Sequence, residues 1–150
     1  MHGHPTRAGP DGSFATARQL VRTFSVGFDR RDVEVAVAPF SADMLWIQRV
    51  ADGPWTRFEG LGEVRAMVRA MFVRHAEQRR RHLTTNLIGE ANGPGHWRVR
   101  SFLTLLTLVP GGKPSLIATG TYEDDIERRG SEWLITRRLL TLDGVPVTID

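Results

Sequence analysis

The chain has 150 residues, of which 41% are hydrophobic and 25% charged, which is the size and composition of one domain with a real core. It contains no cysteine, which excludes disulfides, thiolate nucleophiles and cysteine-ligated zinc. The net charge is only +3, and the arginine run at 79–81 has no interleaved aromatic residues, so we expect no nucleic-acid partner.

Residues 1–12 are rich in glycine, proline and polar side chains, which predicts a flexible leader before a single domain over 13–150. The leader lacks the apolar core of a signal peptide, and no apolar run approaches the ~20 residues of a membrane span. We therefore expect a cytoplasmic protein without a membrane partner. The histidines other than His82 fall in this leader, at a helix end and in a turn, and this scatter predicts no metal site.

Two helices are predicted at the start of the domain. Apolar side chains recur at helical spacing over about 14–27. The sequence FDRRD interrupts this pattern, and Asp32 is placed to cap a short helix over 33–38 that Pro39 ends. The pattern therefore indicates a long helix, a turn and a short second helix.

A hairpin and a third helix follow. The segments MLWIQRV at 44–50 and PWTRFEG at 54–60 have strand-like composition and are joined by the turn ADG, which predicts a hairpin. The stretch over 60–78 has helical periodicity, with arginines on its outer face. Its predicted buried stripe comprises Val64, Met67, Val68, Met71 and Phe72.

The second half is predicted to be a meander of four strands. From His82 the hydrophobic pattern takes the strand period of two, over 82–90, 96–109, 115–127 and 132–143. Short turns rich in glycine and proline join these segments, so each strand is expected to run antiparallel to the next. Three helices packed on one face of a strongly curved sheet make an α+β roll, a cone whose open end suits a small apolar molecule.

Strand alternation also predicts which side chains face the inside of the cone. Ser101 is expected to point inward, because the opposite parity would bury two arginines that need partners. Thr84 and Asn86 are expected to share the face of His82. The residues expected to face inward together with Ser101 are Val99, Leu103 and Leu105.

Three stretches carry a resemblance to a known family: FDRRD after the first helix, RHLTTN at the start of a strand, and GTYEDDIERRGSEWLITRR near the C-terminus. Over about 13–143 the chain resembles the NTF2-like, SnoaL-like superfamily of cone-shaped domains. It is most similar to the branch with hexachlorocyclohexane dehydrochlorinase, scytalone dehydratase and bile-acid dehydratases. The resemblance implies three N-terminal helices packed on a curved, mostly antiparallel sheet. The superfamily includes lyases, isomerases, cyclases and non-catalytic subunits, so it does not imply one activity.

The resemblance also implies a catalytic site. In the dehydrochlorinase and dehydratase branch, an aspartate after the first helix pairs with a histidine that opens the strand after the long helix; these match Asp29 and His82. A neutral imidazole is a base near pH 7, and a carboxylate on its other nitrogen fixes the tautomer and stabilises the imidazolium. A tryptophan on the first strand and an arginine on the last, here Trp46 and Arg138, complete the dehydrochlorinase site, with the arginine stabilising an anion.

The other predicted substrate contacts are Phe28, Asn86, Ser101 and Tyr122. The dehydratases place tyrosine hydroxyls in the pocket, whereas Tyr122 is the one tyrosine of this chain and Phe28 takes the place beside the aspartate. Base-initiated elimination or isomerisation therefore fits better than dehydration of the scytalone type.

The three predicted catalytic residues, Asp29, His82 and Arg138, each have a structural alternative that the sequence leaves open. Asp29 can simply end a helix, and His82 can be a strand residue that is hydrogen-bonded to a main-chain carbonyl. Arg138 can form a structural ion pair with Asp29, Glu123 or Asp125.

The function expected from these features is that of a cofactor-independent lyase, isomerase or polyketide-cyclase-like enzyme acting on a hydrophobic small molecule. His82 would be the base, Asp29 its orienting partner and Arg138 the anion stabiliser. The alternative is a non-catalytic small (beta-type) subunit of a ring-hydroxylating dioxygenase, or a small-molecule-binding module. An epoxide-opening Asp–Arg–Asp arrangement is a third possibility, but the carboxylates it needs are not evident. The long strands favour a homodimer, and the substrate stays open.

Overall fold

Residues 13–148 are described by the computed structural model, and the predicted leader at 1–12 lies outside the described residues. The predicted order of two helices, a hairpin, a third helix and four long strands is confirmed. No helix within the described range is long and apolar enough to cross a bilayer. The elements are α1 (Ser13–Asp29), α2 (Val33–Val37), β1 (Phe40–Val50), β2 (Thr56–Glu59), α3 (Leu61–Arg74), β3 (Arg79–Ala91), β4 (His96–Leu108), β5 (Ser115–Arg129) and β6 (Glu132–Leu142).

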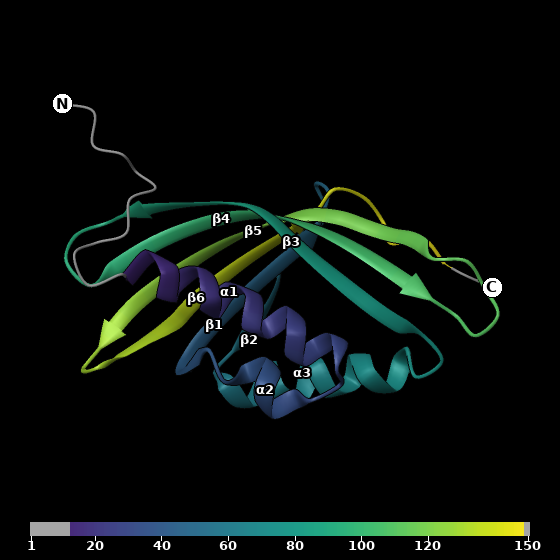
Figure 1. Cartoon of the computed structure of the whole chain (residues 1–150), viewed down its shortest axis with the longest axis horizontal. Helices are drawn as coiled ribbons and strands as arrows, with labels where there is room; N and C mark the ends of the chain where they lie inside the picture. Colours follow the sequence, from purple (N-terminus) through teal and green to yellow (C-terminus); the bar gives the residue numbers. More distant parts are fainter. Residues whose placement is uncertain (1–12, 149–150) are drawn as a thin grey trace.

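All six strands form one sheet, in the order β2-β1-β6-β5-β4-β3. Neighbouring strands are antiparallel except β1 and β6, which run parallel and place Trp46 opposite Arg138. The sheet is strongly curved, and the three helices lie together on its concave side (Figure 1). This is the predicted α+β roll.

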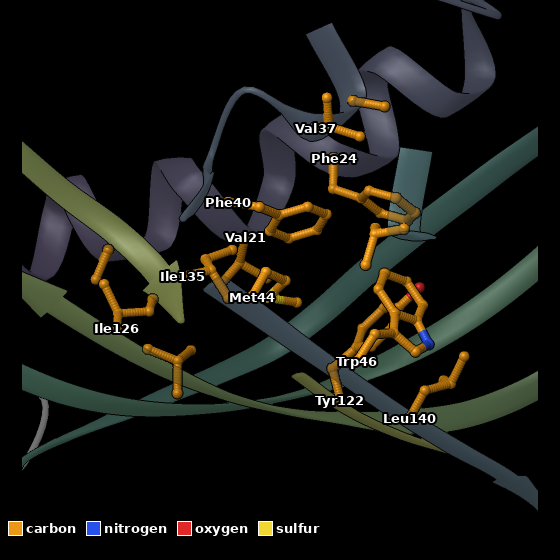
Figure 2. Packing of buried hydrophobic residues seen from close by; sticks show 14 of the residues in the cluster. Val21, Phe24, Val37, Phe40, Met44, Trp46, Tyr122, Ile126, Ile135 and Leu140 are labelled. Carbon is orange, nitrogen blue, oxygen red and sulfur yellow. The ribbon is translucent and has the colours of Figure 1, made fainter. Parts of the chain in front are cut away.

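The apolar side of α1 packs against the concave face of the sheet. Phe24 of this helix meets Phe40 and Trp46 of β1 at ring-centroid distances of 5.6 and 5.2 Å. Figure 2 shows this cluster together with Tyr122 and Leu140 from the sheet. The buried hydrophobic residues of α1 recur at intervals that place them on one face of a helix: Phe14, Ala17, Val21, Phe24 and Phe28.

The short helix α2 begins as predicted. The carboxylate of Asp32 accepts a hydrogen bond of 3.1 Å from the backbone N–H of Val35, which satisfies one of the free donors of the first turn. The turn between α1 and α2 brings Asp29, at the end of α1, to the rim of the concave face, where β3 passes.

Strand parity is confirmed on β4 and partly wrong on β3. On β4, Ser101 is buried on the inner face and Phe102 is 53% exposed on the outer one. On β3, the pairing with β4 shifts register between Thr85 and Ile88, and Asn86 has a positive φ of 56°. This bulge interrupts the alternation, so Asn86 is exposed and does not share the face of His82.

The start of β3 also differs from the prediction. The strand begins at Arg79, three residues before the expected His82, so the arginine run belongs to the strand. Alternation then places Arg80 on the face of His82 and leaves Arg79 and Arg81 exposed on the other side.

Candidate active site

An apolar cavity of about 320 Å³ lies between the helices and the concave face of the sheet. Most of its wall is made by aromatic and aliphatic side chains of α1, α3 and the sheet. The polar residues that line it are few: Gln48, Arg74, Arg80, His82 and Tyr122. A mostly apolar cavity with a few convergent polar groups is typical of a small-molecule site.

His82 of β3 lines this cavity and contacts Asp29 at the end of α1. The Nδ1 atom of His82 lies 2.6 Å from Oδ1 of Asp29, and the backbone N–H of His82 donates a 2.9 Å hydrogen bond to Oδ2. The side chains are only 7% and 15% exposed, respectively. Because Nδ1 faces a carboxylate, we assign its proton to that nitrogen, which leaves the lone pair of the imidazole on Nε2.

The imidazole sits among aromatic rings. Its ring centroid lies 4.7 Å from that of Phe28 and 6.3 Å from that of Phe24. Both phenylalanines also line the cavity. This setting lowers the local dielectric around a base, which strengthens its interaction with the Asp29 carboxylate.

The predicted contacts Phe28, Trp46 and Tyr122 all line the cavity. The indole Nε1–H of Trp46 donates to Oε1 of Gln48 at 2.9 Å, which fixes the orientation of this wall. Burial raises the pKa of Tyr122 to about 12, so its phenol keeps its proton at neutral pH. Tyr122 therefore brings a protonated phenol, and not a base, to the lining of the cavity.

Arg138 occupies a different place from the one predicted. It is fully buried and does not line the cavity. Its Nε and Nη2 donate to the carboxylate of Asp124 at 2.6 and 3.1 Å, so its partner is neither Asp29, Glu123 nor Asp125. Burial opposes the charge of the guanidinium, but the contacts with Asp124 outweigh it and raise the pKa of Arg138.

Aromatic rings surround the Arg138 guanidinium, and two of them, those of Tyr122 and Trp46, also line the cavity. Its central carbon lies 4.1 Å from the ring centroid of Tyr122 and 5.4 Å from that of Trp46. Such contacts stabilise a desolvated cation. Within residues 13–148, Asp124 is the one carboxylate within 4.0 Å of Arg138, so the second carboxylate of an Asp–Arg–Asp arrangement is missing there.

Two further predicted contacts do not line the cavity. Ser101 is buried on the inner face of β4, and its hydroxyl has no hydrogen-bond partner in the described part of the chain. Asn86 is exposed at the β3 bulge. Neither residue therefore contacts the cavity.

Sequence reasoning missed Asp124 and Arg80. Both follow from alternation: Asp124 is two residues from the inward-facing Tyr122 on β5, and Arg80 is two residues from His82 on β3. The register between β5 and β6 sets Asp124 directly opposite Arg138.

A second, more open hollow of about 650 Å³ borders the α1–α2 turn, the segment after α3 and the β4–β5 turn. It contacts Asp29 but not His82, so the apolar cavity is where the imidazole can reach a ligand. Within residues 13–148, no three side chains of His, Cys, Asp or Glu gather as metal ligands.

Many solved structures share the fold, and three of them show how widely it occurs. A protein of unknown function with a cystatin-like fold from Nostoc punctiforme is 20% identical, with 91% of this chain and 95% of that chain covered and a TM-score of 0.71. ActVI-ORFA from Streptomyces coelicolor is 19% identical, with 88% and 98% covered and a TM-score of 0.75. A protein from Novosphingobium aromaticivorans, described as the beta subunit of an aromatic-ring-hydroxylating dioxygenase, is 15% identical, with 89% and 91% covered and a TM-score of 0.75.

These likenesses establish the NTF2-like fold and leave the activity open. A comparison with curated proteins finds no match. The model of the SnoaL-like domain, however, matches residues 15–139, which is most of the chain. The protein therefore belongs to the SnoaL-like domain family.

Proposed function

We propose that this protein is a cofactor-independent enzyme that removes a proton from an activated carbon of a hydrophobic small molecule. The observation that carries the proposal is the 2.6 Å contact between Asp29 and the Nδ1 atom of His82 at an apolar cavity. Elimination, isomerisation or cyclisation can follow from the same first step, so the class is lyase, isomerase or cyclase.

The proposed step uses the free lone pair of His82. Its Nε2 takes the proton from the carbon, the C–H electron pair stays on the substrate, and the imidazolium is stabilised by the Asp29 carboxylate. Tyr122 keeps its proton and supplies a donor for negative charge that develops on the substrate. Arg138 is confined to the layer below the cavity, where it holds Asp124 and the aromatic wall in place.

A model carbon acid tests the general base without knowledge of the native substrate. We expect the protein to cleave 5-nitrobenzisoxazole: the base removes the ring proton, the C–H electrons complete a nitrile, and the N–O bond breaks to release a coloured phenolate. His82→Ala should lower kcat/KM for this reaction by about 10²–10⁴-fold, which is the usual contribution of a positioned general base. Phenolate absorbance measures the rate.

The matched control is His96→Ala, because His96 is a histidine near a turn, outside the cavity. Its rate should equal that of the unmodified protein. Turnover that survives His82→Ala would contradict the proposal. A protein without turnover that copurifies with an iron–sulfur oxygenase would support the non-catalytic alternative instead.

We also propose that the protein is a homodimer that pairs through the outer face of its sheet. Phe102 is 53% exposed there, and Phe102→Glu should convert the dimer to a monomer, because it places a charge in the contact. Light scattering after size exclusion measures the mass, and a monomeric unmodified protein would overturn this proposal. The other large apolar side chains exposed on β3, β4 and β5 are Leu83, Ile88, Leu108 and Leu116.

A further inference from the structure

One end of the cavity is cationic and lacks a counterion. Arg80 of β3 and Arg74 in the last turn of α3 both line the cavity. Within residues 13–148, no carboxylate lies within 4.0 Å of either guanidinium. Asp29 lies near Arg80 but forms no ion pair with either arginine, and its two oxygens instead accept hydrogen bonds from the ring and the backbone of His82.

Arg80 is more buried than Arg74. It is half-buried, and its Nε donates to Oε1 of Gln78 at 3.2 Å. Its terminal nitrogens have no hydrogen-bond partner in the described part of the chain. Burial, together with the charge of Arg31, lowers the pKa of Arg80. A partly desolvated guanidinium with free donors is stabilised when an anion binds it.

Arg31 adds a third positive charge near this end of the cavity. Its Nη2 donates to the backbone carbonyls of His75, Ala76 and Gln78, which joins the α1–α2 turn to the segment that leads into β3. Partial burial lowers the pKa of His75, and the charges of Arg80, Arg74 and Arg31 lower it further. The charges of three guanidinium groups are therefore all close enough to His75 to lower its pKa.

We propose that Arg80, assisted by Arg74, binds a carboxylate group of the ligand that occupies the apolar cavity. This inference rests on the proposed function only in taking the cavity as the substrate site. The rest of the wall suits an apolar ring system, so the expected ligand is a hydrophobic monocarboxylate.

The spacing along β3 relates the carboxylate to the base. Arg80 and His82 are two residues apart on one face, and a strand rises about 3.3 Å per residue, so their Cα atoms are separated by roughly 7 Å. A carboxylate bound to Arg80 therefore sets a carbon only a few bonds away against Nε2 of His82. Arg80 thus selects and positions the substrate, a task for which the buried Arg138 is not available.

A pair of probes that differ in charge but share one ring system tests this subsite. Calorimetric titration of the full chain with 2-naphthoate and 2-naphthamide should show that the carboxylate binds about 10- to 100-fold more tightly, as expected for hydrogen bonds to a charged group. Arg80→Gln should reduce this preference to about fivefold or less, since the exposed Arg74 alone contributes only as a surface charge.

The matched control is Arg81→Gln, which removes an exposed arginine from the opposite face of the same strand. It should retain the full preference for naphthoate. Circular dichroism should show that Arg80→Gln keeps the fold of the unmodified protein. Equal affinities for the two probes, no binding of either, or a preference unchanged in Arg80→Gln would overturn the subsite. Arg74→Gln provides a second variant, for which a smaller loss of preference is expected.

The result is separable from that of the general-base test. His82→Ala should lose benzisoxazole cleavage and keep the naphthoate preference. If the preference depends on Arg80 while the unmodified protein shows no cleavage, the carboxylate subsite stands and the catalytic proposal fails. If cleavage depends on His82 while naphthoate has no advantage over naphthamide, the catalytic proposal stands and the subsite fails.

Discussion

Replacing Arg138 with methionine should lower the free energy of unfolding by about 3–5 kcal/mol, because Asp124 is then left as a buried charge without its partner. Both side chains are inaccessible to solvent, and two hydrogen bonds join them. Urea denaturation followed by tryptophan fluorescence measures the change.

Two further variants distinguish the effect of breaking the buried ion pair on stability from the effect of removing a positive charge. Arg137→Met removes the neighbouring arginine, which is partly exposed and 3.8 Å from Asp125, and should cost less than about 0.5 kcal/mol. The double variant Asp124→Leu with Arg138→Met removes both charges and should recover most of the lost stability. An Arg138→Met protein as stable as the unmodified one would show that Asp124 is not held as a charged group by Arg138.

Replacing Asp29 with asparagine should lower benzisoxazole cleavage by about 10²–10⁴-fold while the protein stays folded. The amide oxygen can still accept the backbone N–H of His82, as Oδ2 of Asp29 does. The amide nitrogen then faces Nδ1 and donates to it, which moves the ring proton to Nε2. The lone pair that acts as the base is therefore turned away from the cavity.

Nitrogen NMR of the His82 ring measures this change of tautomer independently of turnover. Asp32→Asn is the matched control: Asp32 caps α2 through Val35, and asparagine caps a helix about as well as aspartate. It should change neither the tautomer nor the rate. An Asp29→Asn protein with full turnover would contradict the assigned role of Asp29.

The local parts of the fold could be predicted because their signals lie within a few residues. The helical spacing of Phe24 and Phe28, the cap at Asp32 and the alternation around Ser101 each depend on neighbours in sequence. Asn86 was misplaced because one extra residue in a strand reverses every later side chain. Asparagine tolerates a positive φ better than most residues, and this was the one local sign of the bulge.

The site depends on contacts that local patterns do not contain. Asp29 and His82 are 53 residues apart, and only the resemblance to a family suggested that they meet. The partner of Arg138 depends on the register between β5 and β6, which sets Asp124 opposite it. Had the inward face of Tyr122 been extended by two residues, Asp124 would have been a candidate partner.

Both contacts that orient His82 join the end of α1 to β3. The Asp29 carboxylate grips both the ring and the main chain of His82, and β3 is an edge strand held by one neighbour in the sheet. Separation of β3 from α1 would break both contacts together and leave the ring without the carboxylate that orients it. The proposed proton transfer therefore requires β3 to be packed against α1, because only that arrangement keeps the His82 ring on its carboxylate partner.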